Sequence, residues 1–142
     1  MTETLYAFNI TRQSFISLGV KAADTSFGRL RGLLGKMRLR SDEALWVYPS
    51  RSIHTIGLMF PIDVIYLDAQ MRAVHIIESL GPLRIAPIRL QSESILELPP
   101  RSVYHSGTQV GDQLTICTPK QMEEYWEKQP PGSREPKAAN AP

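Results

Sequence analysis

Residues 52–68 read SIHTIGLMFPIDVIYLD, which is two apolar runs joined through a phenylalanine and a proline. Both runs are rich in β-branched and aromatic residues, which favour strands. Pro61 separates them because proline has no amide hydrogen to give to a sheet ladder. The stretch therefore predicts two consecutive β-strands, and it places His54, Asp63 and Asp68 among their apolar residues.

Short runs of the same kind continue on both sides of this stretch, with turn-forming proline, glycine and aspartate residues between them. The expected strands cover residues 5–10, 14–20, 44–48, 52–59, 63–68, 73–80, 94–99 and 113–118. The first two form a hairpin. Strands and helices do not alternate, which argues against a parallel nucleotide-binding sheet. We predict a mainly β (α+β) protein: a compact antiparallel β-barrel-like fold with one amphipathic helix.

The amphipathic helix is expected near residues 27–34, where Phe27, Leu30 and Leu34 recur at three- and four-residue spacing. Gly35 is a typical helix end, since glycine readily adopts the left-handed conformation found there. We therefore expect one helix between the strands at 14–20 and 44–48.

The end of the chain differs in composition from the rest. Residues 1–118 are expected to form the single barrel-like domain, and residues 119–128 a short helix that begins at Pro119. The remainder, residues 129–142, contains four prolines and no large apolar residue. We expect that tail to be disordered, because it has too little apolar surface to bury.

Composition gives weak guidance to function. The 142 residues carry a formal net charge of +2, too little to indicate nucleic acid or membrane binding by itself. The single cysteine cannot form an internal disulfide. The N-terminus lacks the apolar run of a signal peptide, and no run of about 18 apolar residues occurs anywhere. A soluble, cytoplasmic protein is the resulting prediction.

Four short motifs, in order and at fixed spacing, resemble a known family. They are RGLLG (31–35), SIHTIGLMFPIDVIYLD (52–68), ILELP (95–99) and VGDQL (110–114). Together they resemble the prokaryotic domain-of-unknown-function 192 family over the stretch from Leu5 to Thr118. The resemblance implies a compact β-rich barrel-like fold with one main helix. It implies no established reaction, cofactor or ligand.

His54 and Asp63 are weak candidates for a catalytic pair. An imidazole near a carboxylate can act as a general base, which would suit a small hydrolase-like enzyme. A packed histidine is the commoner case, however. Asp63 and Asp68 lie five residues apart in one run, so they project to opposite faces of a strand. We expect Asp63 to accept hydrogen bonds from backbone amides at the strand start, and Asp68 to do so in a turn.

The sequence contains no pattern that indicates a metal or cofactor. His54, His75 and His105 lie on separate segments without paired spacing, so we predict no metal site. There is no phosphate-binding glycine loop and no nucleophile elbow, and we predict no cofactor. Cys117 lies within the last expected strand and is interpreted as a core residue.

The most distinctive charge pattern is a basic run at residues 29–40, which holds five cations and no acid. It could give weak RNA binding, although the aromatic residues typical of single-strand binders are missing. With two later arginines it could also form an anion-binding rim. The candidate binding residues are Arg31, Lys36, Arg38, Arg40, Arg84 and Arg89.

Residues 82–94 form a long, proline-bearing connection between two expected strands. Long ordered loops often carry binding sites. The leading hypothesis is a non-enzymatic accessory or binding domain that presents a loop-lined groove, beside residues 51–61, to a peptide, a small anion or a partner protein. The alternatives are the His54 and Asp63 enzyme and RNA binding through the basic run.

Overall fold

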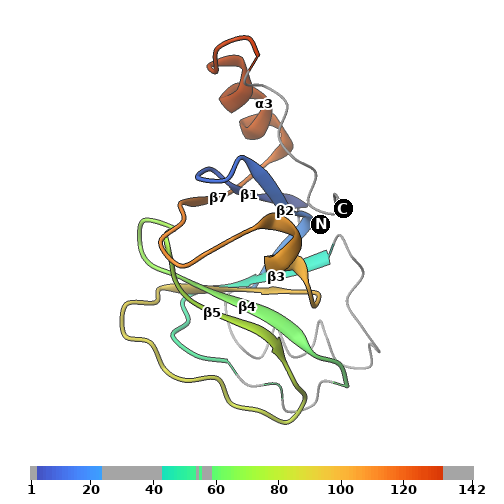
Figure 1. Cartoon of the computed structure of the whole chain (residues 1–142), viewed down its shortest axis with the longest axis vertical. Helices are drawn as coiled ribbons and strands as arrows, with labels where there is room; N and C mark the ends of the chain where they lie inside the picture. The colour runs from blue at the N-terminus through green and yellow to red at the C-terminus, as the bar shows by residue number, and fades with distance from the viewer. Residues whose placement is uncertain (1–2, 24–42, 54, 56–58, 133–142) are drawn as a thin grey trace.

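The computed structural model describes residues 3–23, 43–53, 55 and 59–132. Within these residues the chain forms one seven-stranded sheet with two helices (Figure 1). The strands are β1 (Leu5–Asn9), β2 (Ser14–Ala23), β3 (Glu43–Val47), β4 (Ile62–Leu67), β5 (Ala73–Leu80), β6 (Ser94–Leu98) and β7 (Leu114–Cys117). The helices are α2 (Ser102–Ser106) and α3 (Pro119–Glu127). The predicted mainly β class is confirmed.

The strands follow the order β5-β4-β6-β3-β2-β1-β7, and the sheet curls into a half-barrel. All neighbouring strands are antiparallel except β2 and β3, which pair in parallel. The two outer strands meet at one end of the sheet. There Ala73 donates a backbone hydrogen bond to Asp112 (2.9 Å), and Leu114 donates one to Met71 (3.0 Å). These bonds bring the two edges of the sheet together at that end.

A strand buried on both faces lies near the centre of the fold. All six residues of β4 are buried, and its five apolar side chains are divided between two apolar clusters on opposite faces. Ile65 and Leu67 pack in the main core of the half-barrel. Ile62, Val64 and Tyr66 pack on the other face, with Phe60 and the loop residue Ala86. The second cluster therefore joins the sheet to the loops below it.

A polar network fastens the β1–β2 hairpin to the segment before β7. The buried carboxylate of Asp112 accepts hydrogen bonds from Asn9 Nδ2 (3.0 Å), Arg12 Nε (3.0 Å) and the amide of Gln109 (2.9 Å). Burial alone would raise the pKa of Asp112, but these hydrogen bonds and the Arg12 charge outweigh it and lower that pKa below its usual value. The network thus favours the ionised carboxylate.

Helix α3 extends beyond the sheet at the end opposite the β5–β6 connection (Figure 1). Thr118 caps it: its hydroxyl accepts from the amide of Gln121, whose side chain accepts from the Thr118 amide. Met122 is buried against Phe8 and Cys117. The helix occupies the segment in which the sequence favours one. Of the expected tail, residues 133–142 lie outside the described residues.

Two features of the local structure differ from the sequence prediction. The described residues of 52–59 do not form a strand. Ile53 and Thr55 do make backbone hydrogen bonds, to Ala86 and Arg84, but this partner segment contains Pro82 and Pro87, which cannot donate to a ladder. Helix α2 was not predicted. The helix expected at 27–34 lies outside the described residues.

Candidate functional site

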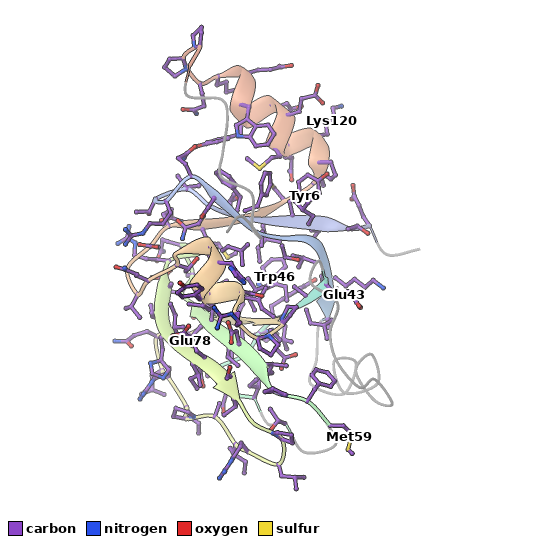
Figure 2. All side chains as sticks on the ribbon, turned by 45° about the vertical axis from the view of Figure 1, so that its right-hand side comes forward. Tyr6, Glu43, Trp46, Met59, Glu78 and Lys120 are labelled. Carbon is purple, nitrogen blue, oxygen red and sulfur yellow. The ribbon has the colours of Figure 1, made fainter. Side chains whose placement is uncertain are left out.

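The most unusual surface in the described structure is the connection between β5 and β6, residues 81–93, here called the β5–β6 loop. It lies at the bottom of Figure 1. Four large aliphatic side chains of this loop are exposed to solvent: Leu83 (73%), Ile85 (75%), Ile88 (67%) and Leu90 (76%). Met59, exposed by 69%, lies at the same end of the molecule (Figure 2). Isolated exposed aliphatics are ordinary, but four within eight residues form a candidate interaction surface.

The loop is held in place by the segment that precedes β4. Thr55 donates its amide to Arg84 O (2.8 Å), and the amide of Ala86 donates to Ile53 O (2.9 Å). Further along, the amide of Arg89 donates to Arg51 O (3.0 Å). The two segments therefore run antiparallel and share backbone hydrogen bonds over much of their length. Their backbone bonds fix the direction in which the loop side chains project.

Side chains add further anchors to the same loop. The buried hydroxyl of Thr55 donates to Gly81 O (2.7 Å) and accepts from the amide of Arg84 (2.8 Å). Ser52 Oγ donates to Ala86 O (2.6 Å). Ala86 itself is buried in the second apolar cluster. The small residue of the loop thus points inward while the large aliphatic ones remain in solvent.

Arg89, half-buried, lies beside an aromatic pair on β4 and β5. The rings of Tyr66 and His75 meet edge to face, with centroids 5.1 Å apart. Arg89 Nη2 lies 3.4 Å from His75 Nε2. Burial, assisted by the Arg89 charge, lowers the pKa of His75 below 6.5, so the imidazole is neutral near pH 7 and its Nε2 can accept from Arg89. The position of Arg89 is therefore partly set by a neutral histidine.

A hollow of about 400 Å³ adjoins the end of the loop, lined by Pro49, Ser50, Arg51, Ser92 and Glu93. Its hydroxyl groups already have structural partners. Ser50 Oγ donates to Ser52 O (2.7 Å), and Ser92 Oγ lies within hydrogen-bond distance of Ser50 O (2.9 Å) and Ser94 O (3.0 Å). The hollow offers a shallow polar rim, and no catalytic group among these residues is poised with a base.

Asp63 is fully buried on β4 and bridges two backbone segments. Oδ1 accepts from the amide of Ser79 (2.9 Å), and Oδ2 accepts from the amide of Val103 at the start of α2 (3.0 Å). This is the kind of backbone role that the sequence predicted for it. His54, its proposed catalytic partner, lies outside the described residues. The structure therefore places one half of the candidate pair and gives it a structural task.

Asp68 has a similar local role in the turn after β4. Its Oδ1 accepts from the amides of Gln70 and Arg72, both at 2.9 Å.

Cys117 is buried, and burial raises the pKa of its thiol, which disfavours the reactive thiolate. Within residues 3–23, 43–53, 55 and 59–132, no three His, Cys, Asp or Glu side chains gather as a metal-ligand set.

Of the six candidate binding residues, two belong to the described structure. Arg84 is exposed and Arg89 is half-buried, and both lie in the β5–β6 loop. Arg31, Lys36, Arg38 and Arg40, with the rest of the 29–40 run, lie outside the described residues. Whether the two groups form one rim stays a prediction.

Sequence reasoning missed the aliphatic residues of the loop as candidates, because apolar letters are ordinarily assigned to a core. It also missed Glu97, which has no exposed surface on β6 and faces its cross-strand neighbours Leu45 and Val64. The signal for Glu97 was available: it is an acidic residue inside the apolar run ILEL. Because a glutamate is almost never fully buried unless it is paired, an acid in an apolar run is a signal of a special role.

Comparison with known proteins identifies the family. The sequence model of DUF192, described as an uncharacterized ACR, matches residues 8–116. The chain belongs to the DUF192 family. This confirms the resemblance inferred from the four motifs. No functionally curated protein gives a significant sequence match.

Two solved structures share the fold of this DUF192 protein. One is a candidate transcription regulator from Sinorhizobium meliloti 1021, with 18% identity, a TM-score of 0.65 and coverage of 82% of this chain and 94% of that one. The other is a protein of unknown function from Novosphingobium aromaticivorans DSM 12444, with 17% identity, a TM-score of 0.63 and coverage of 78% and 82%. At these identities the likeness establishes the fold alone. Neither described helix is long and apolar enough to cross a bilayer.

Proposed function

We propose that this DUF192 domain is a non-enzymatic binding module that docks a partner protein through the β5–β6 loop. The observation that carries the proposal is the display of Leu83, Ile85, Ile88 and Leu90 on a loop whose backbone is hydrogen-bonded to Arg51, Ile53 and Thr55. A loop fixed in this way does not have to be ordered when it binds, so association costs less conformational entropy.

The free energy of burying these four side chains would make a modest net contribution to binding. Fully burying one leucine or isoleucine is worth about 1.5–3 kcal/mol, so four supply roughly 6–12 kcal/mol before costs. Association of two proteins costs about 4–15 kcal/mol in lost freedom. The aliphatic residues alone therefore come close to offsetting that cost, and further contacts are needed for stable binding.

The two alternatives have less support. A hydrolase using His54 and Asp63 would need a carboxylate that reaches a substrate, whereas Asp63 is buried and both of its oxygens accept from backbone amides. RNA binding depends on the 29–40 run, outside the described residues, and the β5–β6 loop has no aromatic side chain on which a base could stack.

Site-specific photo-crosslinking tests the proposal. A photoreactive amino acid replaces Ile85 in the full chain, and a matched chain carries it at Glu123, an exposed position on α3 at the opposite end of the molecule. In cells of the source organism, position 85 should give a discrete protein adduct that position 123 does not. Excess unlabelled protein should compete for that adduct, whereas a variant with serine at 83, 85, 88 and 90 should not. No adduct at position 85, or equal competition by both proteins, would refute the proposal.

A further inference from the structure

The cations of the β5–β6 loop lie between its exposed aliphatic residues. Arg84 is flanked by Leu83 and Ile85, and Arg89 by Ile88 and Leu90. Arg51, which is also exposed, lies on the paired segment, where its backbone carbonyl accepts the amide of Arg89 at 3.0 Å. Residues 81–92 contain no aspartate or glutamate. The surface therefore combines apolar and positively charged groups and has no acid within the loop until Glu93.

These guanidinium groups have no ion partner in the described part of the chain. The only ion pair formed there joins Arg12 and Asp112, at 3.0 Å. It belongs to the network at the other edge of the sheet. Arg51 and Arg84 are exposed, and half-buried Arg89 contacts only the neutral His75 through Nη2, so none of the three charges is neutralised by an acid of the described residues.

The three cations are arginines, which favours protein carboxylates as their ligands. All three positions are arginine, and the described lysines, Lys21, Lys120 and Lys128, lie elsewhere. Arginine binds carboxylates through two parallel hydrogen bonds and is enriched at protein interfaces, whereas lysine is depleted there.

Two other occupants fit less well. A membrane-binding loop ordinarily adds tryptophan or tyrosine at the level of the lipid headgroups, and residues 81–93 have neither. A second copy placed face to face would set arginine against arginine, which is repulsive.

We infer that the β5–β6 loop recognises a partner segment in which aspartate or glutamate residues lie beside aliphatic ones. The inference rests on the proposed function and adds the chemistry of the partner. The aliphatic side chains supply burial, and Arg84, Arg89 and Arg51 pair with the acids and set the specificity.

Three displayed peptide libraries of equal length test this chemistry on the immobilised full chain. Each has randomised aliphatic positions that alternate with acidic positions in the first library, with glutamine and asparagine in the second, and with lysine and arginine in the third. The wild-type protein should retain the acidic library about tenfold or more over the basic one, a preference of the size expected for a few charge-assisted contacts. The preference should weaken with added salt. It should disappear in the triple variant Arg51→Gln, Arg84→Gln, Arg89→Gln, whose folding is checked by its thermal midpoint.

Failure of the inference and failure of the proposed function give different results. Equal retention of the acidic and glutamine libraries, lost only when the four aliphatic residues become serine, overturns the acidic partner and leaves the docking surface. Retention of no library overturns both. Binding to phosphatidylglycerol vesicles without retention of any library replaces the protein partner with a membrane.

Discussion

The phenol of Tyr66 donates a hydrogen bond of 2.6 Å to the backbone carbonyl of Pro87, 21 residues further along the chain. Tyr66 is fully buried on β4, and Pro87 is an exposed residue of the β5–β6 loop. The bond therefore ties the loop directly to the centre of the sheet. It adds a side-chain anchor to a segment that has exposed aliphatic side chains on both sides of Pro87.

Replacing Tyr66 by phenylalanine should loosen this loop without unfolding the domain. The substitution keeps the ring and removes the donor, so we expect a loss of about 1 kcal/mol in the free energy of unfolding. The amides of Ala86 and Arg89 should exchange with solvent faster in Tyr66→Phe than in the wild type, as measured by hydrogen exchange. Tyr104→Phe, at an exposed position on α2, is the control and should leave both amides unchanged. Equal exchange in the two variants would mean that the phenol does not brace the loop.

Asp63 provides a second test, because its two roles predict opposite results. As a bridge between the amides of Ser79 and Val103, its change to asparagine should cost about 2–4 kcal/mol, since one acceptor is replaced by a donor facing a buried amide. Urea unfolding measures this. Asp68→Asn, in a partly exposed turn, should cost about 1 kcal/mol or less. A catalytic Asp63 with no structural task would give a variant as stable as the wild type.

The strands of this fold are predictable from sequence where a β-type run pairs with another run that also forms a strand. The run AVHIIESL matches β5 residue for residue, and DVIYLD matches β4 to within one residue at each end. The run at 52–59 has the same composition, yet its described residues, Ser52, Ile53, Thr55 and Met59, are not in a strand. The partner of this run, residues 81–86, includes Pro82, and its polar groups bond in part to the hydroxyls of Ser52 and Thr55. A local pattern does not contain this information about the partner segment.

The candidate site was only partly accessible to sequence reasoning for a similar reason. A long loop with Arg84 and Arg89 could be recognised from its prolines and charges. The exposure of Leu83, Ile85 and Leu90 could not, since it follows from hydrogen bonds to residues some 30 positions earlier in the chain. Helix α2, with five residues, is too short for a helical period to be recognised.

Asp112 should make stability fall in acid. Its pKa is lowered in the folded protein, so the unfolded chain takes up the proton first as pH falls. Its contribution is complete above the unfolded value of 3.8 and is lost as pH falls through the folded value. Asp112→Asn should cost about 1–3 kcal/mol at pH 7, measured by urea unfolding, and the difference from wild type should shrink at pH 3. Glu123→Gln, on the exposed face of α3, should show neither effect. A difference that stays constant from pH 7 to pH 3 would contradict the role of the ionised carboxylate.

His75 should produce a separate decline in stability at milder pH. Because the folded protein holds its pKa below 6.5, protonation is easier in the unfolded chain. Stability is therefore full above about pH 6.5, and it falls as pH drops from there through the folded value. A nuclear magnetic resonance titration should give an apparent pKa below 6.5 for His75, and His75→Gln should flatten the stability profile between pH 5 and 7. His105→Gln, at an exposed position on α2, should leave that profile as in the wild type.

The magnetic resonance titration of His75 should also shift the signals of the loop amides near Arg89, because a protonated imidazole repels the guanidinium that the neutral ring contacts. If His75 titrates at or above pH 6.5 and the loop amides do not respond, the protonation of His75 does not influence the β5–β6 loop.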